Sequence, residues 1–142
     1  NLIYWHNEDY FGFGASAHSH IDNQRRANIN GVHKYIAAVQ GTSLQGREER
    51  FPWVETYIPL SLSDEIEETA ILGLRLVQEG LRDDLFIERF GSSLFTIYEK
   101  PIKELTKLGL LEECEEEGSH GIRLTKHGRF LGNQVFMRFL LD

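Results

Sequence analysis

The glycine-rich, aromatic segment near the N-terminus has residue types that suit a ligand site. Gly12 and Gly14 flank Phe13, and neither glycine has a Cβ that would keep a ligand away from the backbone. The spacing matches only the beginning of a dinucleotide-binding fingerprint, because no third glycine opens a helix. Two interpretations stay open: a site where the backbone approaches a ligand closely, and a strand end that bends against its neighbour.

Histidines and aromatic residues in the same region offer two further kinds of chemistry. His18 and His20 would share one face of a strand and can bind a metal, but no third ligand has a suitable spacing. The alternative is a pair of polar residues on an open strand edge, and we expect His6 and His33 on the surface. A set of aromatic side chains can stack on a flat ligand or pack against a sheet: Tyr4, Trp5, Tyr10, Phe11 and Phe13.

Other catalytic arrangements have no support in the sequence. Cys114 is the one cysteine among 142 residues, which excludes a disulfide framework and a cysteine cluster, and we interpret it as a small strand residue. There is no serine nucleophile elbow, phosphate-binding P-loop or metalloprotease helix motif. We therefore expect no catalytic residue and no metal ligand in this chain.

Composition and charge limit the classes of partner that the chain is expected to bind. Hydrophobic residues make up 41% and charged residues 26%, as in a soluble globular protein, and no apolar run is long enough to span a membrane. The net charge of −7 argues against nucleic acid as a partner, because phosphate binding needs a basic surface. The single cysteine fits the cytoplasm, and a beginning without Met or a signal peptide suggests a part of a longer protein.

The elements that must position the N-terminal residues are a strand, a hairpin and a helix. The strand is expected to run into a tight loop at 10–17, and the hairpin to span 17–30 with Asp22 and Asn23 as its turn. A helix capped by Asn30 should follow and stop at Gly41. We expect an irregular connection over 41–60, which predicts two domains, 1–56 and 57–142.

The second domain is predicted to be mainly helical. A helix from about Ser63, with Ile66, Ala70, Leu74 and Val77 on one face, should continue to Gly80. Glycines end two shorter helices, at 84–90 (capped by Asp83) and 101–108. Strands at 110–114 and 122–124 should enclose a loop at 115–121, before a last helix that Thr125 caps, with Leu131, Val135 and Phe139 on one face. This order is typical of a winged-helix-like module.

The presumed wing is strongly acidic. Five glutamates lie between positions 112 and 117. In a DNA-binding winged helix the wing lies near phosphate, which would repel these carboxylates. The sequence therefore favours protein contact over DNA contact for this module.

Several motifs, in this order, carry a resemblance to a known family. They are the segments 1–5, 10–19, 71–76 with 80–81, 90–91, 108–112 and 124–128. Together they resemble the C-terminal third of oxygen-independent coproporphyrinogen III oxidase-like proteins, and in particular the radical-SAM heme chaperones of the HemW type. The resemblance spans essentially the whole chain.

The resemblance implies cofactors that the longer protein would hold. A 4Fe-4S cluster and S-adenosyl-L-methionine would lie in an incomplete barrel whose cluster cysteines are absent from this sequence, so no cofactor is expected in this part alone. The resemblance places five residues near S-adenosylmethionine, namely Gly12, Gly14, Ala15, Ser16 and His18. It also identifies Asn1, Tyr4 and Trp5 with a heme-binding motif whose histidine would precede Asn1, and His6 is not that residue.

The expectation is an α+β, mainly helical fold. The end of an incomplete radical-SAM barrel (strand, hairpin, helix and linker) would precede a helical module with a winged-helix-like hairpin. The expected function is a heme chaperone that binds heme and transfers it to an acceptor protein, and this part alone would not be an enzyme. One alternative is a coproporphyrinogen III oxidase that decarboxylates two propionates to give protoporphyrinogen IX. The other is a winged-helix-like protein-interaction module.

Overall fold

The computed structural model describes residues 2–41, 50–116 and 118–141. The chain divides into two compact units. We call residues 8–62 the hairpin unit, and residues 1–7 together with 63–142 the C-terminal unit. Each unit is described by itself below.

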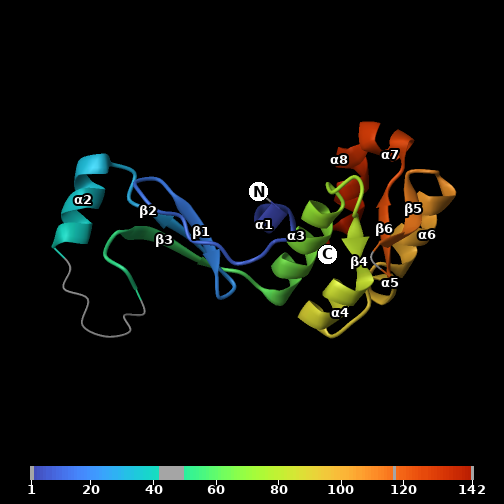
Figure 1. The fold of residues 1–142 in the computed structure, drawn as a ribbon, viewed down its shortest axis with the longest axis horizontal. Coiled ribbons are helices and arrows are strands. Elements are labelled where there is room, and N and C mark those ends of the chain that lie inside the picture. Colours follow the sequence, from blue (N-terminus) through green and yellow to red (C-terminus); the bar gives the residue numbers. More distant parts are fainter. Residues whose placement is uncertain (1, 42–49, 117, 142) are drawn as a thin grey trace. The chain divides into compact units, whose positions relative to one another are not determined.

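The hairpin unit consists of an antiparallel sheet and one helix (Figure 1). Its elements are β1 (His18–Ile21), β2 (Gln24–Asn28), α2 (Val32–Gln40) and β3 (Val54–Pro59), and the strand order is β1-β2-β3. Asp22 and Asn23 form the β1–β2 turn with φ of 51° and 55°, the left-handed values that a two-residue hairpin turn requires. The predicted hairpin and its turn are confirmed.

Three expectations for the hairpin unit were wrong. Residues 54–59 form β3, paired with β2, instead of continuing an irregular connection. No strand precedes the hairpin in the described part of the unit, where Tyr10 makes an isolated bridge with His20. The N-cap of α2 is Gly31 and not Asn30, because Asn30 Oδ1 accepts a hydrogen bond from Ser16 Oγ at 2.5 Å.

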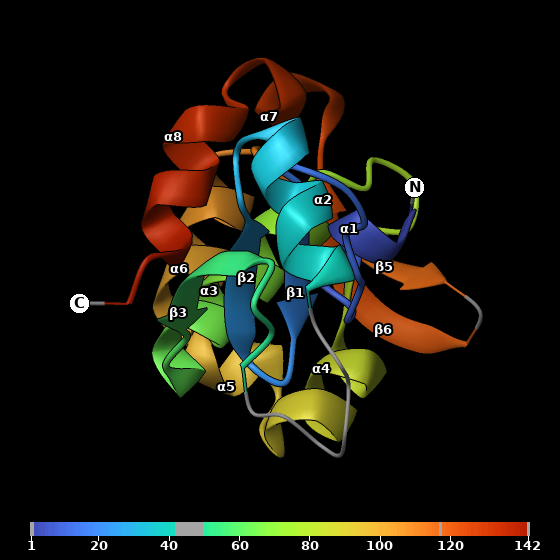
Figure 2. The ribbon, with the colours of Figure 1, turned by 90° about the vertical axis from the view of Figure 1, so that its left-hand side faces the viewer.

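The C-terminal unit combines a second antiparallel sheet with short helices, and the β5–β6 hairpin projects from it (Figures 1 and 2). Its helices are α1 (Leu2–Trp5), α3 (Leu62–Gly73), α4 (Asp83–Phe90), α5 (Leu94–Ile97), α6 (Glu99–Lys107), α7 (Lys126–Phe130), α8 (Gly132–Phe136) and a 3-10 turn (Met137–Phe139). Its strands are β4 (Leu81–Arg82), β5 (Leu111–Glu116) and β6 (Ser119–Leu124), in the order β4-β6-β5. Both sheets are open and three-stranded in the described residues.

A continuous apolar core holds the C-terminal unit together. Phe86, Tyr98 and Phe139 are at most 1% exposed, and the Tyr98 ring lies beside both phenylalanine rings. The Tyr98 hydroxyl donates a hydrogen bond to the Phe139 carbonyl at 3.1 Å, so its polar tip is paired inside the core. Burial raises the pKa of the Tyr98 phenol well above its usual value, because a phenolate would lose its hydration there.

The long helix predicted from Ser63 to Gly80 ends earlier. Gly73 is the last helical residue, and a Cβ there would lie 2.8 Å from Leu81 Cδ1. The chain then tightens into a turn in which Leu76 N donates to Gly73 O at 3.0 Å. Ile66, Ala70 and Leu74 are buried as expected, but Val77 is 42% exposed because it lies beyond the helix.

Other boundaries in the C-terminal unit differ in smaller ways. Asp83 begins α4 and does not cap it, because its carboxylate accepts hydrogen bonds from Ser93 Oγ and Leu94 N at the start of α5. Most of the loop predicted at 115–121 belongs to β5 and β6. Thr125 does cap α7, accepting from Gly128 N at 2.9 Å, but the single last helix that was expected is divided at Leu131. In the described part of the chain, no helix is both long and apolar enough to cross a membrane.

Candidate functional site

The loop between Tyr10 and β1 is fixed to the hairpin by backbone hydrogen bonds. Tyr10 N donates to His20 O at 2.7 Å, and His20 N donates to Tyr10 O at 3.0 Å. Further along, Gly12 lies directly against β1, where a Cβ would be 2.1 Å from the His18 carbonyl oxygen. Position 12 therefore requires glycine because of a close backbone approach.

A buried amide holds the two glycines in place. Asn28, which is 4% exposed, donates from Nδ2 to Gly12 O at 3.2 Å and to Gly14 O at 2.9 Å. The Tyr35 hydroxyl on α2 accepts from Gly14 N at 3.2 Å. Sheet, loop and helix thus share one polar network around the Gly12–Phe13–Gly14 segment.

The backbone at Gly14 is open on the side where a side chain would stand. Its φ is 103°, a value that L-residues rarely adopt, and a Cβ there would meet nothing within 4 Å. Ser16 also has a positive φ of 61°, and its amide donates to Ile29 O at 3.1 Å. This geometry leaves room for a ligand to approach the Gly14 backbone.

Beside this loop lies a cavity of about 410 Å³, a volume in the range of small-molecule sites. Phe51 and Trp53 stack at 5.0 Å between ring centroids, and Phe11 and Phe13 lie 6.4 Å apart. All four line the cavity, together with Gly12, Ser19, Arg26, Asn28, Tyr35, Val39 and Val54. Its walls are mainly apolar and aromatic, which suits a flat ligand. We call this space the aromatic cavity.

Arg26 is the cation of the aromatic cavity. Its side chain is 12% exposed, and its guanidinium lies 5.7 Å from the Tyr57 ring centroid and 3.7 Å from Asp22 Oδ2. Among the described residues, its buried Nε has no hydrogen-bond partner. An acidic group on a ligand would supply one.

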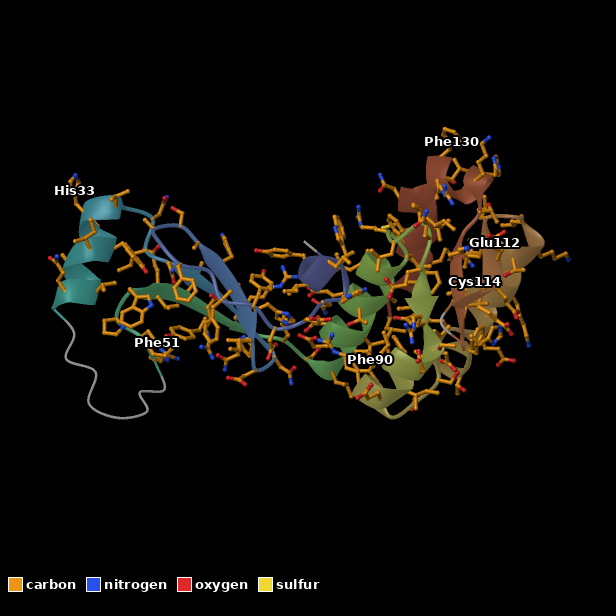
Figure 3. The ribbon with its side chains drawn as sticks, in the orientation of Figure 1. His33, Phe51, Phe90, Glu112, Cys114 and Phe130 are labelled. Carbon is orange, nitrogen blue, oxygen red and sulfur yellow. The ribbon has the colours of Figure 1, made fainter. Side chains whose placement is uncertain are left out.

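The remaining residues that were singled out in the first unit lie around this cavity or away from it. His18 is exposed opposite Ala27, whereas His20 is buried. Ala15 is half-buried in the loop. His33 on α2 is exposed as expected and lies at the outer side of the helix (Figure 3). In the described residues, no group of three or more His, Cys, Asp or Glu side chains could hold a metal ion.

The residues that the resemblance identifies with a heme-binding motif fall in the C-terminal unit. Tyr4 on α1 is 49% exposed, and Trp5 is half-buried, while Asn1 lies outside the described residues. Trp5 and His6 line a small cavity of about 70 Å³ against α3 and α4. This volume is far below that of a typical ligand pocket.

Polar contacts anchor the segment after α1. His6 was expected on the surface, but its Nε2 lies 3.0 Å from Glu79 Oε2. Asn7 Nδ2 donates to Thr69 Oγ1 at 3.1 Å. Arg89 donates to the Asn7 carbonyl at 2.6 Å and to the buried Glu65 carboxylate at 2.6 Å. Residues 2–7 are therefore built into the C-terminal unit.

The acidic hairpin is partly neutralised by its own strand partner. Glu112 accepts from Arg123 Nε at 2.7 Å, and Glu113 lies 2.9 Å from His120 Nε2. Figure 3 shows Glu112 and Cys114 on β5, and the Cys114 thiol lies 3.8 Å from the Glu79 carbonyl.

Hydrogen bonds from Arg82, and then from Ser119, hold the pKa of the Asp84 carboxyl on α4 well below its usual value.

Sequence reasoning missed most of the residues that line the aromatic cavity. Arg26, Asn28 and Tyr35 were not singled out as site residues, and Phe51 and Trp53 fell in the presumed connection. The signal that could have found them was the run Val54–Ile58, which is rich in β-branched and aromatic residues. A strand there must pair with the hairpin, and this brings Trp53 beside the Gly12 loop.

The chain is similar to known proteins in sequence and in fold. The heme chaperone HemW of Bacillus subtilis is 37% identical over 99% of this chain, and that of Lactococcus lactis is 35% identical over 100%. The chain spans about a third (34%) of the length of these relatives. The solved structure described as "Coproporphyrinogen III oxidase (HemN) from Escherichia coli is a Radical SAM enzyme" matches 94% of this chain and 28% of its own, with a TM-score of 0.57 and 21% identity.

That structural match shows a shared fold alone. The HemN C-terminal domain family matches residues 60–131, which covers α3 to α7 and the sheet of the C-terminal unit. This is just over half of the 142 residues. The chain therefore belongs to the HemN C-terminal domain family.

Proposed function

We propose that the protein acts in heme trafficking, as the C-terminal part of a radical-SAM protein that binds heme and transfers it to an acceptor protein. The observation that carries this proposal is the similarity to two proteins named heme chaperone over 99% and 100% of this chain. The cytoplasm is the proposed location. Under this proposal, this part of the protein need not catalyse a reaction itself.

The heme would lie against the exposed face of α1. Tyr4 presents half of its surface to solvent and Trp5 a smaller part, so both rings can contact a flat macrocycle at its edge or face. Asn1 would belong to the same contact, together with the histidine that precedes it in the family motif. Because the adjoining cavity holds only about 70 Å³, the macrocycle would rest on the surface and not enter it.

S-adenosylmethionine is proposed to lie near the Gly12–Phe13–Gly14 loop in the longer protein. The residues here fit such a cofactor: the Gly14 backbone is open, His18 is exposed, and Ala15 and Ser16 continue the loop. The aromatic cavity and Arg26 would border the same site. A 4Fe-4S cluster held by three cysteines needs residues beyond this sequence, which has Cys114 alone. When bound, these groups would supply radical chemistry.

We also propose residues 1–56 as the end of the barrel and 57–142 as a helical domain with a winged-helix-like hairpin, with residues 2–7 of the first part packed into the C-terminal unit. The order α3, β4, α4, α6, β5 and β6, with β6 central in the sheet, supports this interpretation. Its acidic hairpin favours a protein partner over DNA. Duplex DNA affinity that falls steeply with salt would contradict it.

Heme titration tests the main proposal. The protein, extended upstream to include the motif histidine, should shift the heme Soret band, and the Tyr4→Ala/Trp5→Ala double variant should lose most of that shift. Phe130→Ala, which removes an aromatic side chain that is 82% exposed, serves as the matched control and should bind as before. No Soret shift in the extended protein would end the heme proposal.

An anaerobic assay distinguishes the chaperone from the oxidase. The full-length protein would be supplied with coproporphyrinogen III, S-adenosylmethionine and a reductant. A chaperone should yield no protoporphyrinogen IX above a heat-inactivated sample. Catalytic formation of protoporphyrinogen IX would contradict the chaperone proposal and assign the oxidase activity instead.

A further inference from the structure

The α7–α8 end of the C-terminal unit carries a hollow of about 500 Å³ that the proposed function does not use. Figure 3 shows Phe130 at this end of the unit, and its side chain is 82% exposed. The residues of the hollow that matter below are Arg75, Arg129, Phe130, Gln134 and Phe136. We call it the arginine hollow. Phe130 and Phe136 give this hollow an apolar part that a side chain of a partner could cover.

The arginines of the C-terminal unit differ in their partners. Four pair with a carboxylate: Arg82 with Asp84, Arg89 with Glu65, Arg123 with Glu112, and Arg138 with Glu104. In the described residues, Arg75 and Arg129 have no carboxylate partner. Both line the arginine hollow. In a chain with a net charge of −7, these two exposed cations in one hollow offer a local site of positive charge to an external anion.

Neutral groups hold both guanidiniums at the hollow. Arg75 lies over the Phe136 ring, 4.6 Å from its centroid. Arg129 donates from Nη2 to the Val77 carbonyl at 3.2 Å. A guanidinium has five N–H donors, so each keeps several for a carboxylate while its position is already restricted.

We propose that the arginine hollow binds an acidic segment of a partner protein. An apolar side chain of that segment would pack on Phe130 and Phe136, and flanking carboxylates would accept hydrogen bonds from Arg75 and Arg129. The amide of Gln134 adds a neutral donor and acceptor at the wall. The proposal does not depend on heme binding.

The charge pattern favours a peptide over a nucleic acid. A nucleic-acid groove needs a row of basic residues along the backbone, whereas two arginines line this hollow and the chain as a whole is acidic. Two carboxylates beside an apolar side chain match two guanidiniums beside two phenylalanines. This complementarity favours an acidic peptide with an apolar side chain over a nucleic acid in the arginine hollow.

A labelled peptide tests the proposal. The probe is a fluorescein-labelled peptide with one phenylalanine flanked on both sides by glutamates, and anisotropy is measured against the intact protein. Arg75→Gln/Arg129→Gln should weaken binding by about tenfold or more, because two charge-assisted hydrogen bonds are lost. Lys103→Gln/Lys107→Gln on α6 changes the net charge equally and should leave affinity within about twofold.

Each other result would overturn the proposal. Equal binding of a peptide with glutamines in place of glutamates would show that charge does not select the ligand, and absence of binding would show that the hollow takes no such segment. Tighter binding of a labelled single-stranded oligonucleotide would assign the hollow to nucleic acid. Self-association in sedimentation that the arginine double variant abolishes would assign it to a second copy of the chain.

Discussion

The two units of the molecule bury different kinds of side chain. In the C-terminal unit, fifteen hydrophobic residues from Ile66 to Phe139 are buried and form one cluster. In the described residues of the hairpin unit, no hydrophobic side chain reaches that degree of burial. Its buried residues are instead Ser19, His20 and Asn28. One unit is thus held by an apolar core, and the other by a polar network beneath half-exposed aromatic rings.

The lack of an apolar core among its described residues leaves apolar side chains of the hairpin unit exposed. Phe11 and Phe13 are 57% and 87% exposed, and on α2 the side chains of Val32 and Ile36 are 63% and 43% exposed. Apolar surface of this extent is stabilised when another surface or a ligand covers it. It supports the proposal that the hairpin unit packs against cofactors and further barrel residues in a longer protein.

The largest expected effect comes from the core of the C-terminal unit. Phe86 is 1% exposed and packs edge-on against Phe90 at 4.8 Å between centroids. Phe86→Ala should lower the free energy of unfolding of this unit by about 3–5 kcal/mol, because it leaves a cavity in a well-packed core. Urea unfolding measures the change.

The two tryptophans allow each unit to be followed separately. Trp5 belongs to the C-terminal unit and Trp53 to the hairpin unit. Fluorescence in a Trp53→Phe background should report the loss caused by Phe86→Ala, whereas in a Trp5→Phe background the transition of the hairpin unit should stay in place. An equal shift in both backgrounds would mean that the units unfold together, and the comparison between them would fail.

A medium effect is expected from the polar network of the hairpin unit. Asn28→Ala removes the amide that donates to the Gly12 and Gly14 carbonyls, and both acceptors lose their partner. The transition reported by Trp53 should fall by about 1–3 kcal/mol. Asn30→Ala, which removes an exposed acceptor of Ser16, is the matched control and should cost less. Equal losses of stability in the two variants would show that the bonds from Asn28 to the Gly12 and Gly14 carbonyls are not what stabilises the unit.

How much of the fold could be predicted depended on whether the signal was local. The hairpin turn was predictable because Asp22 and Asn23 tolerate positive φ. The helix cap at Thr125 was predictable because a capping side chain bonds to an amide only three residues away. The end of α3 at Gly73 was not predicted, and the reason for a glycine at this position, its contact with Leu81, comes from a residue in the next strand. β3 was missed because its pairing with β2 spans a long separation in the sequence.

The candidate site, too, could be predicted only where its signal lies in neighbouring residues of the sequence. The spacing of Gly12 with Gly14 left open a ligand site and a strand end that bends against its neighbour, and the structure places Gly12 against the His18 carbonyl of β1. Arg26 and Trp53 reach the same cavity only through strand register, which composition does not encode. The resemblance named the Gly12 loop, but not the residues that wall it.

Tyr98→Phe should have a smaller effect, with a characteristic pH dependence. Loss of the hydroxyl leaves the buried Phe139 carbonyl without this donor and should cost about 1 kcal/mol at neutral pH. Burial raises the pKa of Tyr98 in the folded state, so the folded protein retains the proton while the unfolded chain releases it above about pH 10. Stability of the C-terminal unit should therefore fall as the pH rises past 10, and less steeply in Tyr98→Phe. Parallel pH profiles would contradict this account.

The smallest expected effect on stability is the sharpest test of the comparison. Phe13→Ala removes the same ring as Phe86→Ala, but from a side chain that is 87% exposed, so the Trp53 transition should move by less than about 0.5 kcal/mol. If the exposed ring serves a ligand, the same variant should weaken S-adenosylmethionine binding by the longer protein, measured by calorimetry. A loss of stability near that of Phe86→Ala would show that Phe13 belongs to a core. An unchanged affinity would remove it from the proposed cofactor site, because a ring that neither stabilises the unit nor binds a ligand has no role there.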